Sequence, residues 1–100
     1  DWGWAPEYVD AMWRMLQQEH ADDFVIATGE SHSLKEFVAE AFSYLDLDWH
    51  EHVQVDLSLM RPSDIAKSCG NAAKAQAILG WQSEATFKDI VHTMVEGCVD

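Results

Sequence analysis

Two residues of the sequence, Arg61 and Asp64, have side chains and a spacing that suit the binding of a phosphorylated ligand. Arg61 precedes Pro62, and this stiff junction presents a guanidinium that can contact two oxygens of a diphosphate at once. Asp64 could accept hydrogen bonds from the hydroxyls of a ribose. Two alternatives stay open at this point, because Arg61 could form a surface ion pair with a nearby carboxylate and Asp64 could simply form a turn.

A second cluster, His50-Glu51-His52, contains the ligand types that zinc prefers. Two histidines separated by one residue, with no third ligand in a defined motif, are a weak metal signal, so we predict no metal site. Cys69 and Cys98 are too few for a disulfide framework and too isolated for a metal knuckle. We therefore expect both to be reduced thiols.

The charge balance limits the partners of the chain. Its 100 residues include 6 Lys and Arg against 18 Asp and Glu, which gives a formal net charge of −12. Such a field repels phosphate backbones and argues against nucleic acid, whereas a small anionic ligand needs a specific cation in a cleft. No apolar run approaches the roughly 18 residues of a membrane span, and no secretory leader is visible. We therefore expect a soluble, cytoplasmic protein with no membrane partner.

The elements that must position these residues are mainly helices, predicted from apolar side chains at the 3.6-residue period. The first covers residues 6–18 and starts at Pro6, whose missing N–H is not needed in a first helical turn. The second covers residues 34–45 and follows a capping box of Ser33 and Glu36. Both of these helices lie in the first half of the chain.

Two more helices are predicted in the second half. Residues 72–79 form an alanine-rich helix between Asn71 as N-cap and Gly80 as left-handed C-cap. Residues 87–97 form an amphipathic helix after Thr86, which makes a capping box with the acidic residue three positions later. The remaining histidines beside helices, His32 and His92, are expected to be exposed or capping.

Short apolar runs predict two strands, at residues 24–28 and 53–56. The fold class is therefore α+β with helices dominant. Two short strands cannot make a self-sufficient sheet, because about three strands with a packed face are needed. We predict that residues 1–100 form a single partial domain that needs cover from a missing partner, and that Asp1 follows a domain boundary.

Five stretches occur in a specific order along the chain: DWGWAPEYVDAMWRMLQ, DDFVIATGESHSLKEFVAEAF, VQVDLSLMRPSDI, GNAAKAQAILGW and ATFKDIVHTMV. On these stretches the chain resembles the C-terminal portion of the GDP-mannose 4,6-dehydratase family, within the extended short-chain dehydrogenase/reductase superfamily. The resemblance covers nearly the whole chain and is long and ungapped around its first two stretches.

The resemblance implies a two-lobed, NADP-dependent lyase that forms a homo-oligomer as the full-length enzyme. An N-terminal Rossmann α/β lobe would bind NADP, and the C-terminal lobe represented by this chain would bind the nucleotide sugar. The implied reaction removes water from GDP-mannose to give GDP-4-dehydro-6-deoxymannose, for deoxysugar biosynthesis of the fucose or rhamnose type. The glycine-rich loop and the Tyr-x-x-x-Lys pair of the first lobe are absent here, since neither Tyr8 nor Tyr44 has Lys four residues later. We therefore expect no catalytic, cofactor-binding or metal-binding residue on this chain, which should be inactive alone.

The resemblance also bears on the candidate site. It implies that Arg61 and Asp64 bind the substrate and that Trp2 lies near the start of the substrate cleft. Asp64 replaces the usual Glu, GNAAKA at residues 70–75 replaces GDP-x-KA, and AKSCG at residues 66–70 is more polar than the usual apolar stretch. The tryptophans as a group are expected to serve packing more than sugar stacking: Trp2, Trp4, Trp13 and Trp81.

Two alternatives to this interpretation remain open. The chain could be the lobe of another nucleotide-sugar epimerase, dehydratase or reductase. It could also be a small acidic helical interaction module whose exposed apolar surface meets a protein partner.

Overall fold

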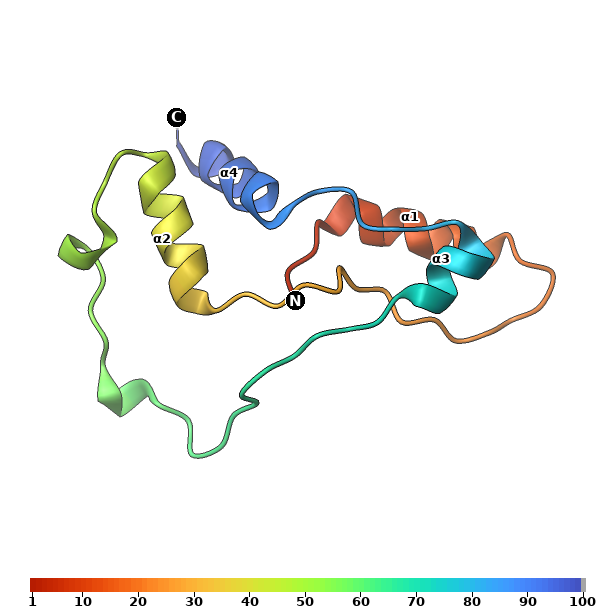
Figure 1. Cartoon of the computed structure of the whole chain (residues 1–100), viewed down its shortest axis with the longest axis horizontal. Helices are drawn as coiled ribbons and strands as arrows, with labels where there is room; N and C mark the ends of the chain where they lie inside the picture. The colour runs from red at the N-terminus through yellow and green to blue at the C-terminus, as the bar shows by residue number, and fades with distance from the viewer. Residues whose placement is uncertain (100) are drawn as a thin grey trace.

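The computed structural model describes residues 1–99 and is built from helices, turns and extended segments in that range. Its four α-helices are α1 (Ala5–Leu16), α2 (Leu34–Tyr44), α3 (Ala73–Leu79) and α4 (Phe87–Cys98). Two 3-10 turns, η1 (Trp49–Glu51) and η2 (Leu57–Leu59), lie in the long loop after α2. The helices pack in two pairs, α1 with α3 and α2 with α4, at opposite ends of the molecule (Figure 1). The four predicted helices are confirmed, with ends within two residues of the prediction.

Both predicted capping boxes are present. The Ser33 hydroxyl accepts a hydrogen bond from the Glu36 backbone N–H at 3.1 Å, and the Glu36 carboxylate accepts one from the Ser33 N–H at 3.2 Å. Thr86 and Asp89 make the same reciprocal pair at the start of α4, each bond at 3.1 Å. Free N–H groups of both first turns are thus satisfied by side chains, which fixes where α2 and α4 begin.

Capping residues stabilise both ends of α3, and one arginine of α1 bonds to its C-terminal end. Asn71 accepts a hydrogen bond from the Ala73 N–H at 3.0 Å, although the backbone places the N-cap one residue later than predicted. Gly80 has φ +67°, so its predicted left-handed C-cap is confirmed. Arg14 on α1 donates to the carbonyls of Leu79 and Gly80 at 3.2 and 2.9 Å. These bonds satisfy carbonyls that the end of α3 leaves free.

Trp81 forms the centre of the core between these two helices. Its side chain is 2% exposed and packs with Ala11, Ala75 and Leu79. The indole N–H donates to the Glu7 carbonyl of α1 at 2.7 Å, so the polar atom of the ring is also satisfied. The predicted packing role of Trp81 is confirmed.

Polar and aromatic contacts join α2 to α4. His92 Nε2 lies 2.7 Å from the Glu40 carboxylate, and the His92 ring stacks on Tyr44 with ring centroids 4.2 Å apart. The Tyr44 hydroxyl donates to Glu96, and this bond raises the pKa of Tyr44. Ile90 and Val91 of α4 are buried. His92 thus joins two helices, and the expectation that it would be exposed or capping is wrong.

The two predicted strands are wrong, since residues 1–99 contain no β-strand. Residues 24–28 run extended, but no neighbouring strand lies beside them to accept and donate ladder hydrogen bonds. Residues 53–56 also lack a partner, and Val55 is 80% exposed. Within the described range the observed class is therefore all-helical, not α+β.

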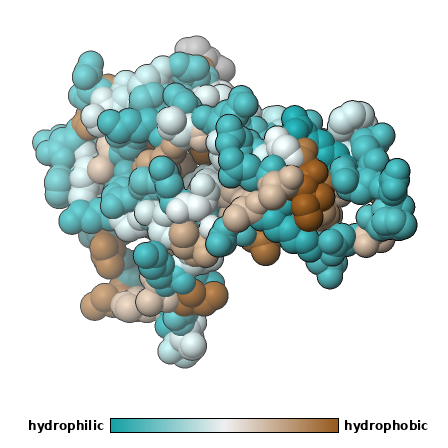
Figure 2. Space-filling model, turned by 45° about the vertical axis from the view of Figure 1, so that its right-hand side comes forward, coloured by the Kyte–Doolittle hydropathy of each residue, from teal (hydrophilic) through white to brown (hydrophobic). Residues whose placement is uncertain are grey.

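The molecule is flat and open. Its principal extents are 53 × 37 × 18 Å and its radius of gyration is 16.8 Å. A compact domain of this length would have a radius of gyration of about 13 Å. Apolar patches reach the surface among hydrophilic residues (Figure 2), and the outer face of α1 exposes most of four apolar side chains: Val9, Met12, Trp13 and Leu16. The packing role expected for Trp13 is wrong in this structure, because its side chain is 60% exposed. None of the helices within residues 1–99 is both long and apolar enough to span a membrane.

Candidate functional site

The structure brings the two candidate ligand-binding residues of the 57–70 loop together. Arg61 Nη2 lies 2.7 Å from Asp64 Oδ2, and both side chains are largely exposed. The other carboxylate oxygen of Asp64 accepts a hydrogen bond from the Ile65 N–H at 2.8 Å. The arginine therefore forms a surface ion pair three residues along the chain, as one interpretation of the sequence allowed.

The turn η2 comes shortly before Arg61 in the chain and is held by hydrogen bonds to Asp56. Asp56 accepts hydrogen bonds from the Ser58 hydroxyl at 2.6 Å and from the Ser58 backbone N–H at 2.9 Å. These two bonds, the hydroxyl first, lower the pKa of the Asp56 carboxyl. A negatively charged Asp56 thus holds the turn that precedes the Arg61–Asp64 pair.

Trp2 lies apart from that ion pair, against the start of α2. Its indole N–H donates to the His32 carbonyl at 3.4 Å, and its ring centroid is 4.8 Å from that of Phe37. The side chain is 36% exposed. Trp2 is therefore packed on one side and free to contact a ligand on another.

A cavity of about 650 Å³, here called the Trp2 cavity, lies beside this tryptophan. Three segments line it, residues 1–2, 31–34 and 65–68. The last of these segments begins directly after Asp64. The cavity thus connects Trp2 with the loop that contains the Arg61–Asp64 pair.

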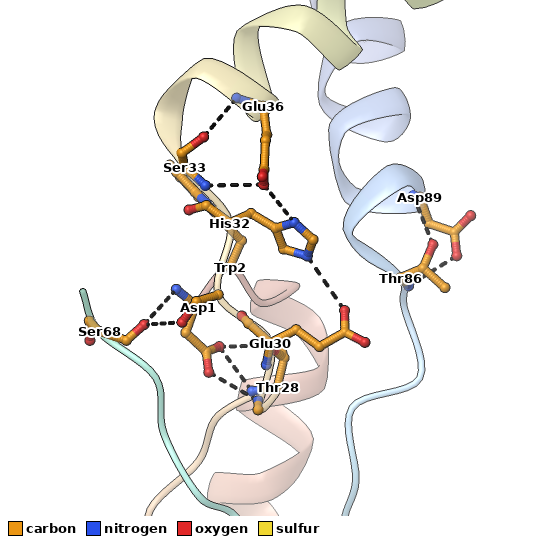
Figure 3. Close-up of polar contacts among 12 residues, drawn as sticks. Asp1, Trp2, Thr28, Glu30, His32, Ser33, Glu36, Ser68, Thr86 and Asp89 are labelled. Atoms are coloured by element: carbon orange, nitrogen blue, oxygen red, sulfur yellow. Dashed lines mark hydrogen bonds and ion pairs between the residues drawn. The ribbon is translucent and has the colours of Figure 1, made fainter. Parts of the chain in front are cut away.

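Hydrogen bonds to the Asp1 carboxylate hold chain segments together beside this cavity. The Asp1 carboxylate accepts hydrogen bonds from the backbone N–H groups of Thr28, Gly29 and Gly70 at 3.0, 3.0 and 3.2 Å. The Thr28 hydroxyl adds a fourth, at 2.7 Å. Figure 3 shows Asp1 between Thr28 and Ser68, two residues that are distant in sequence. The sequence alone does not indicate this role of Asp1, because the type of the residue says nothing about such distant partners.

His32, which also lines the cavity, is held from two sides. Its Nδ1 lies 2.9 Å from the Glu36 carboxylate, and its ring stacks on Phe87 of α4 with centroids 3.9 Å apart. Glu30 approaches Nε2 at 3.5 Å, close enough for an ion pair but without a good hydrogen bond (Figure 3). His32 thus links α2 to α4, and its expected role as an exposed or capping residue is wrong.

The His50-Glu51-His52 cluster does not converge. His50 pairs with Asp48 at 2.8 Å, whereas the His52 ring stacks on Phe42 with centroids 5.4 Å apart. The hydrogen bond from His50 lowers the pKa of Asp48. Over residues 1–99 no group of three or more His, Cys, Asp or Glu side chains is arranged to hold a metal ion. Cys69 and Cys98 are free and exposed.

Comparison with known proteins gives the family. A family profile described as GDP-mannose 4,6 dehydratase matches residues 1–94. GDP-mannose 4,6 dehydratase 1 of Arabidopsis thaliana is 47% identical over 96% of this chain, which corresponds to 27% of that protein. The GDP-mannose 4,6 dehydratases of Dictyostelium discoideum and Homo sapiens are 40% and 38% identical over 95% and 100% of this chain, in each case 32% of the relative. The chain belongs to the GDP-mannose 4,6 dehydratase family.

This membership confirms the resemblance predicted from the sequence. It favours the interpretation that the chain is part of a dehydratase-family protein over the alternative of an unrelated helical interaction module. The chain spans about a third or less of the length of the curated relatives that it matches.

Proposed function

We propose that this chain is the C-terminal, nucleotide-sugar-binding part of a GDP-mannose 4,6-dehydratase. In this proposal the complete enzyme converts GDP-mannose to GDP-4-dehydro-6-deoxymannose, and residues 1–100 form a partial domain that contacts the nucleotide half of the substrate. Family membership supports the choice of substrate. The open shape and the exposed apolar face of α1 support the need for further cover.

The observation that carries the proposal is the family match over residues 1–94, and the exposed Arg61–Asp64 pair is compatible with a ligand-binding role for both residues. An ion pair this exposed contributes at most about 1 kcal/mol, so a diphosphate can compete for the guanidinium at little cost. The remaining N–H groups of Arg61 make no hydrogen bond within residues 1–99. Asp64 would orient the arginine and present its other oxygen toward ribose hydroxyls.

The residues of this chain do not fit NADP, the cofactor that the family resemblance implies. The sequence has no glycine-rich dinucleotide loop, and the structure has no strand within residues 1–99 to precede one. In our proposal NADP is held by a separate Rossmann lobe. The expected homo-oligomer and the cytoplasmic location of the complete enzyme stay predictions.

The first test replaces Arg61 and Asp64 in the complete enzyme. Arg61 would bind a part of the substrate that does not react, so Arg61→Ala should raise KM for GDP-mannose by roughly 10- to 100-fold with a smaller change in kcat. Arg61→Lys should recover only part of the loss, because an ammonium cannot make a planar, two-pronged contact. Asp64→Ala should act in the same direction but more weakly. Steady-state kinetics measure all three.

Lys88→Ala is the matched control for lost positive charge. Lys88 is exposed on α4 and makes no ion pair within residues 1–99, so its removal should leave KM unchanged. An Arg61→Ala enzyme with the KM of the parent would remove Arg61 from the site and leave its loop as a structural connection.

A second test uses the chain by itself. Because the phosphate-cradling loop and the proton-transfer residues are absent, the purified 100-residue chain should neither turn over GDP-mannose nor bind NADP. Product analysis after incubation with both compounds, and a titration with NADP alone, measure this. Detectable turnover would contradict the division of roles proposed here.

A further inference from the structure

Lys67 is the one lysine or arginine among the residues that line the Trp2 cavity. In a chain with a net charge of −12, an anion is repelled by the overall field and binds only where a cation is locally available. The position of this lysine therefore decides whether the cavity can accept an anionic ligand.

Most of the other cations in the chain are engaged. Arg14, Arg61 and Lys74 form ion pairs with aspartates at 3.0, 2.7 and 2.9 Å. Lys35 lies over the Trp49 ring at 5.9 Å. Lys67 makes no ion pair or hydrogen bond with any side chain in residues 1–99, and it is exposed. Its ammonium is thus available to a ligand without the loss of an existing contact.

The cavity that Lys67 lines also has a partly exposed aromatic ring in its lining. A cation and an aromatic ring in one cavity are features of a binding site. Trp2 contributes apolar surface to the lining of the same cavity. The wall that holds Lys67 is fixed at its next residue, because the Ser31 hydroxyl donates to the Ser68 carbonyl at 2.7 Å. Ser68 also accepts a hydrogen bond from the Asp1 nitrogen at 3.3 Å (Figure 3). The backbone beside Lys67 is therefore tied to the two other segments that line the cavity.

We propose that the Trp2 cavity is an anion-binding subsite in which Lys67 binds a phosphoryl group of a nucleoside diphosphate. This inference rests on the proposed function, because it gives that ligand a second cation on the loop of Arg61. Arg61 and Lys67 lie on one exposed loop, on either side of Asp64. A compact, strongly hydrated ammonium suits a phosphoryl oxygen as a point charge.

The acidic residue in the cavity wall, Asp1, does not prevent this. Its carboxylate already accepts four hydrogen bonds, from Thr28, Gly29 and Gly70. These donors offset part of its negative charge and direct both oxygens toward the segments that they hold. Lys67 remains the charged group in the cavity with no such partner.

The experiment titrates the complete enzyme with GDP and, separately, with inorganic pyrophosphate. Binding is followed by calorimetry and by the ¹⁵N-¹H signals of the Trp2 indole and of the amides of residues 65–68. Lys67→Ala and Lys67→Gln should each weaken binding by about 10-fold, and Lys67→Arg should restore most of it. Lys88→Ala removes the same charge from α4 and should change Kd by less than about twofold.

Three outcomes separate this inference from the proposed function. If Lys67→Ala weakens GDP binding and Lys88→Ala does not, the subsite is supported. If Arg61→Ala weakens GDP binding while Lys67→Ala leaves it unchanged, the subsite is overturned and the proposed function stands. If pyrophosphate binds in a Lys67-dependent manner but GDP binds no more tightly, the anion subsite is supported and its nucleotide ligand is overturned. Absence of binding by either compound overturns the subsite.

Discussion

Trp81→Ala should lower the free energy of unfolding by about 3–5 kcal/mol, the range for removing a fully packed aromatic ring. The ring is 2% exposed, fills the space between α1 and α3, and contacts the small side chains of Ala11 and Ala75. Alanines cannot move into the space that the ring leaves, so a cavity should remain. The indole partner, the Glu7 carbonyl, would also lose its hydrogen bond. Urea unfolding followed by far-UV circular dichroism measures the change.

Two further variants make this prediction specific. Trp13→Ala removes the same side chain from α1, where it is 60% exposed, and should cost less than about 1 kcal/mol. Trp81→Phe keeps most of the apolar volume but loses the indole N–H, so its stability should lie between those of the parent and Trp81→Ala. Equal effects at the two tryptophans would mean that the α1–α3 core is not the stabilising centre of this chain.

The helices could be predicted from the sequence because their signals are local. A capping box places both partners within four residues, so Ser33 with Glu36 and Thr86 with Asp89 identify the starts of α2 and α4 before any tertiary contact is known. The left-handed cap at Gly80 is equally local. The Arg61–Asp64 pair belongs to the same group, since only three residues separate its members.

The two strand predictions failed because a strand forms only where a neighbouring segment pairs with it. The apolar run at residues 24–28 satisfies the sequence pattern of a buried strand, but the pattern does not say which chain segment would pair with it. In the structure, backbone N–H groups at the end of this run bond to a side chain, the Asp1 carboxylate, instead of to a strand. Pattern and structure therefore differ where pairing is non-local.

The Trp2 cavity could not be predicted from the sequence for a related reason. It joins residues 1–2 to residues 31–34 and 65–68, three segments that are about thirty positions apart. Only the tertiary structure shows that Lys67, one cation among six, lines the same cavity as Trp2. A sequence can nominate a cation for a loop, but it does not show which aromatic ring shares its cavity.

Gly70→Ala should lower the free energy of unfolding by about 1–3 kcal/mol, because a Cβ at this position overpacks a close contact. That Cβ would lie 2.3 Å from the Ala27 Cβ and 3.4 Å from Val25 Cγ1. Neither segment can retreat freely, since the Asp1 carboxylate bonds to the N–H groups of both Thr28 and Gly70. Relief of the clash would lengthen these bonds. Chemical denaturation measures the change.

Gly97→Ala is the matched control, because a Cβ at Gly97 in α4 meets no heavy atom within 4 Å. Alanine is the better helix former, so this variant should be as stable as the parent or up to about 1 kcal/mol more stable. The double variant Ala27→Gly with Gly70→Ala removes the methyl group that the new Cβ would strike. Its loss of stability should be smaller than the sum of the two single losses by at least about 1 kcal/mol, as expected for residues in direct contact. Strictly additive losses would show that residues 27 and 70 are not in direct contact.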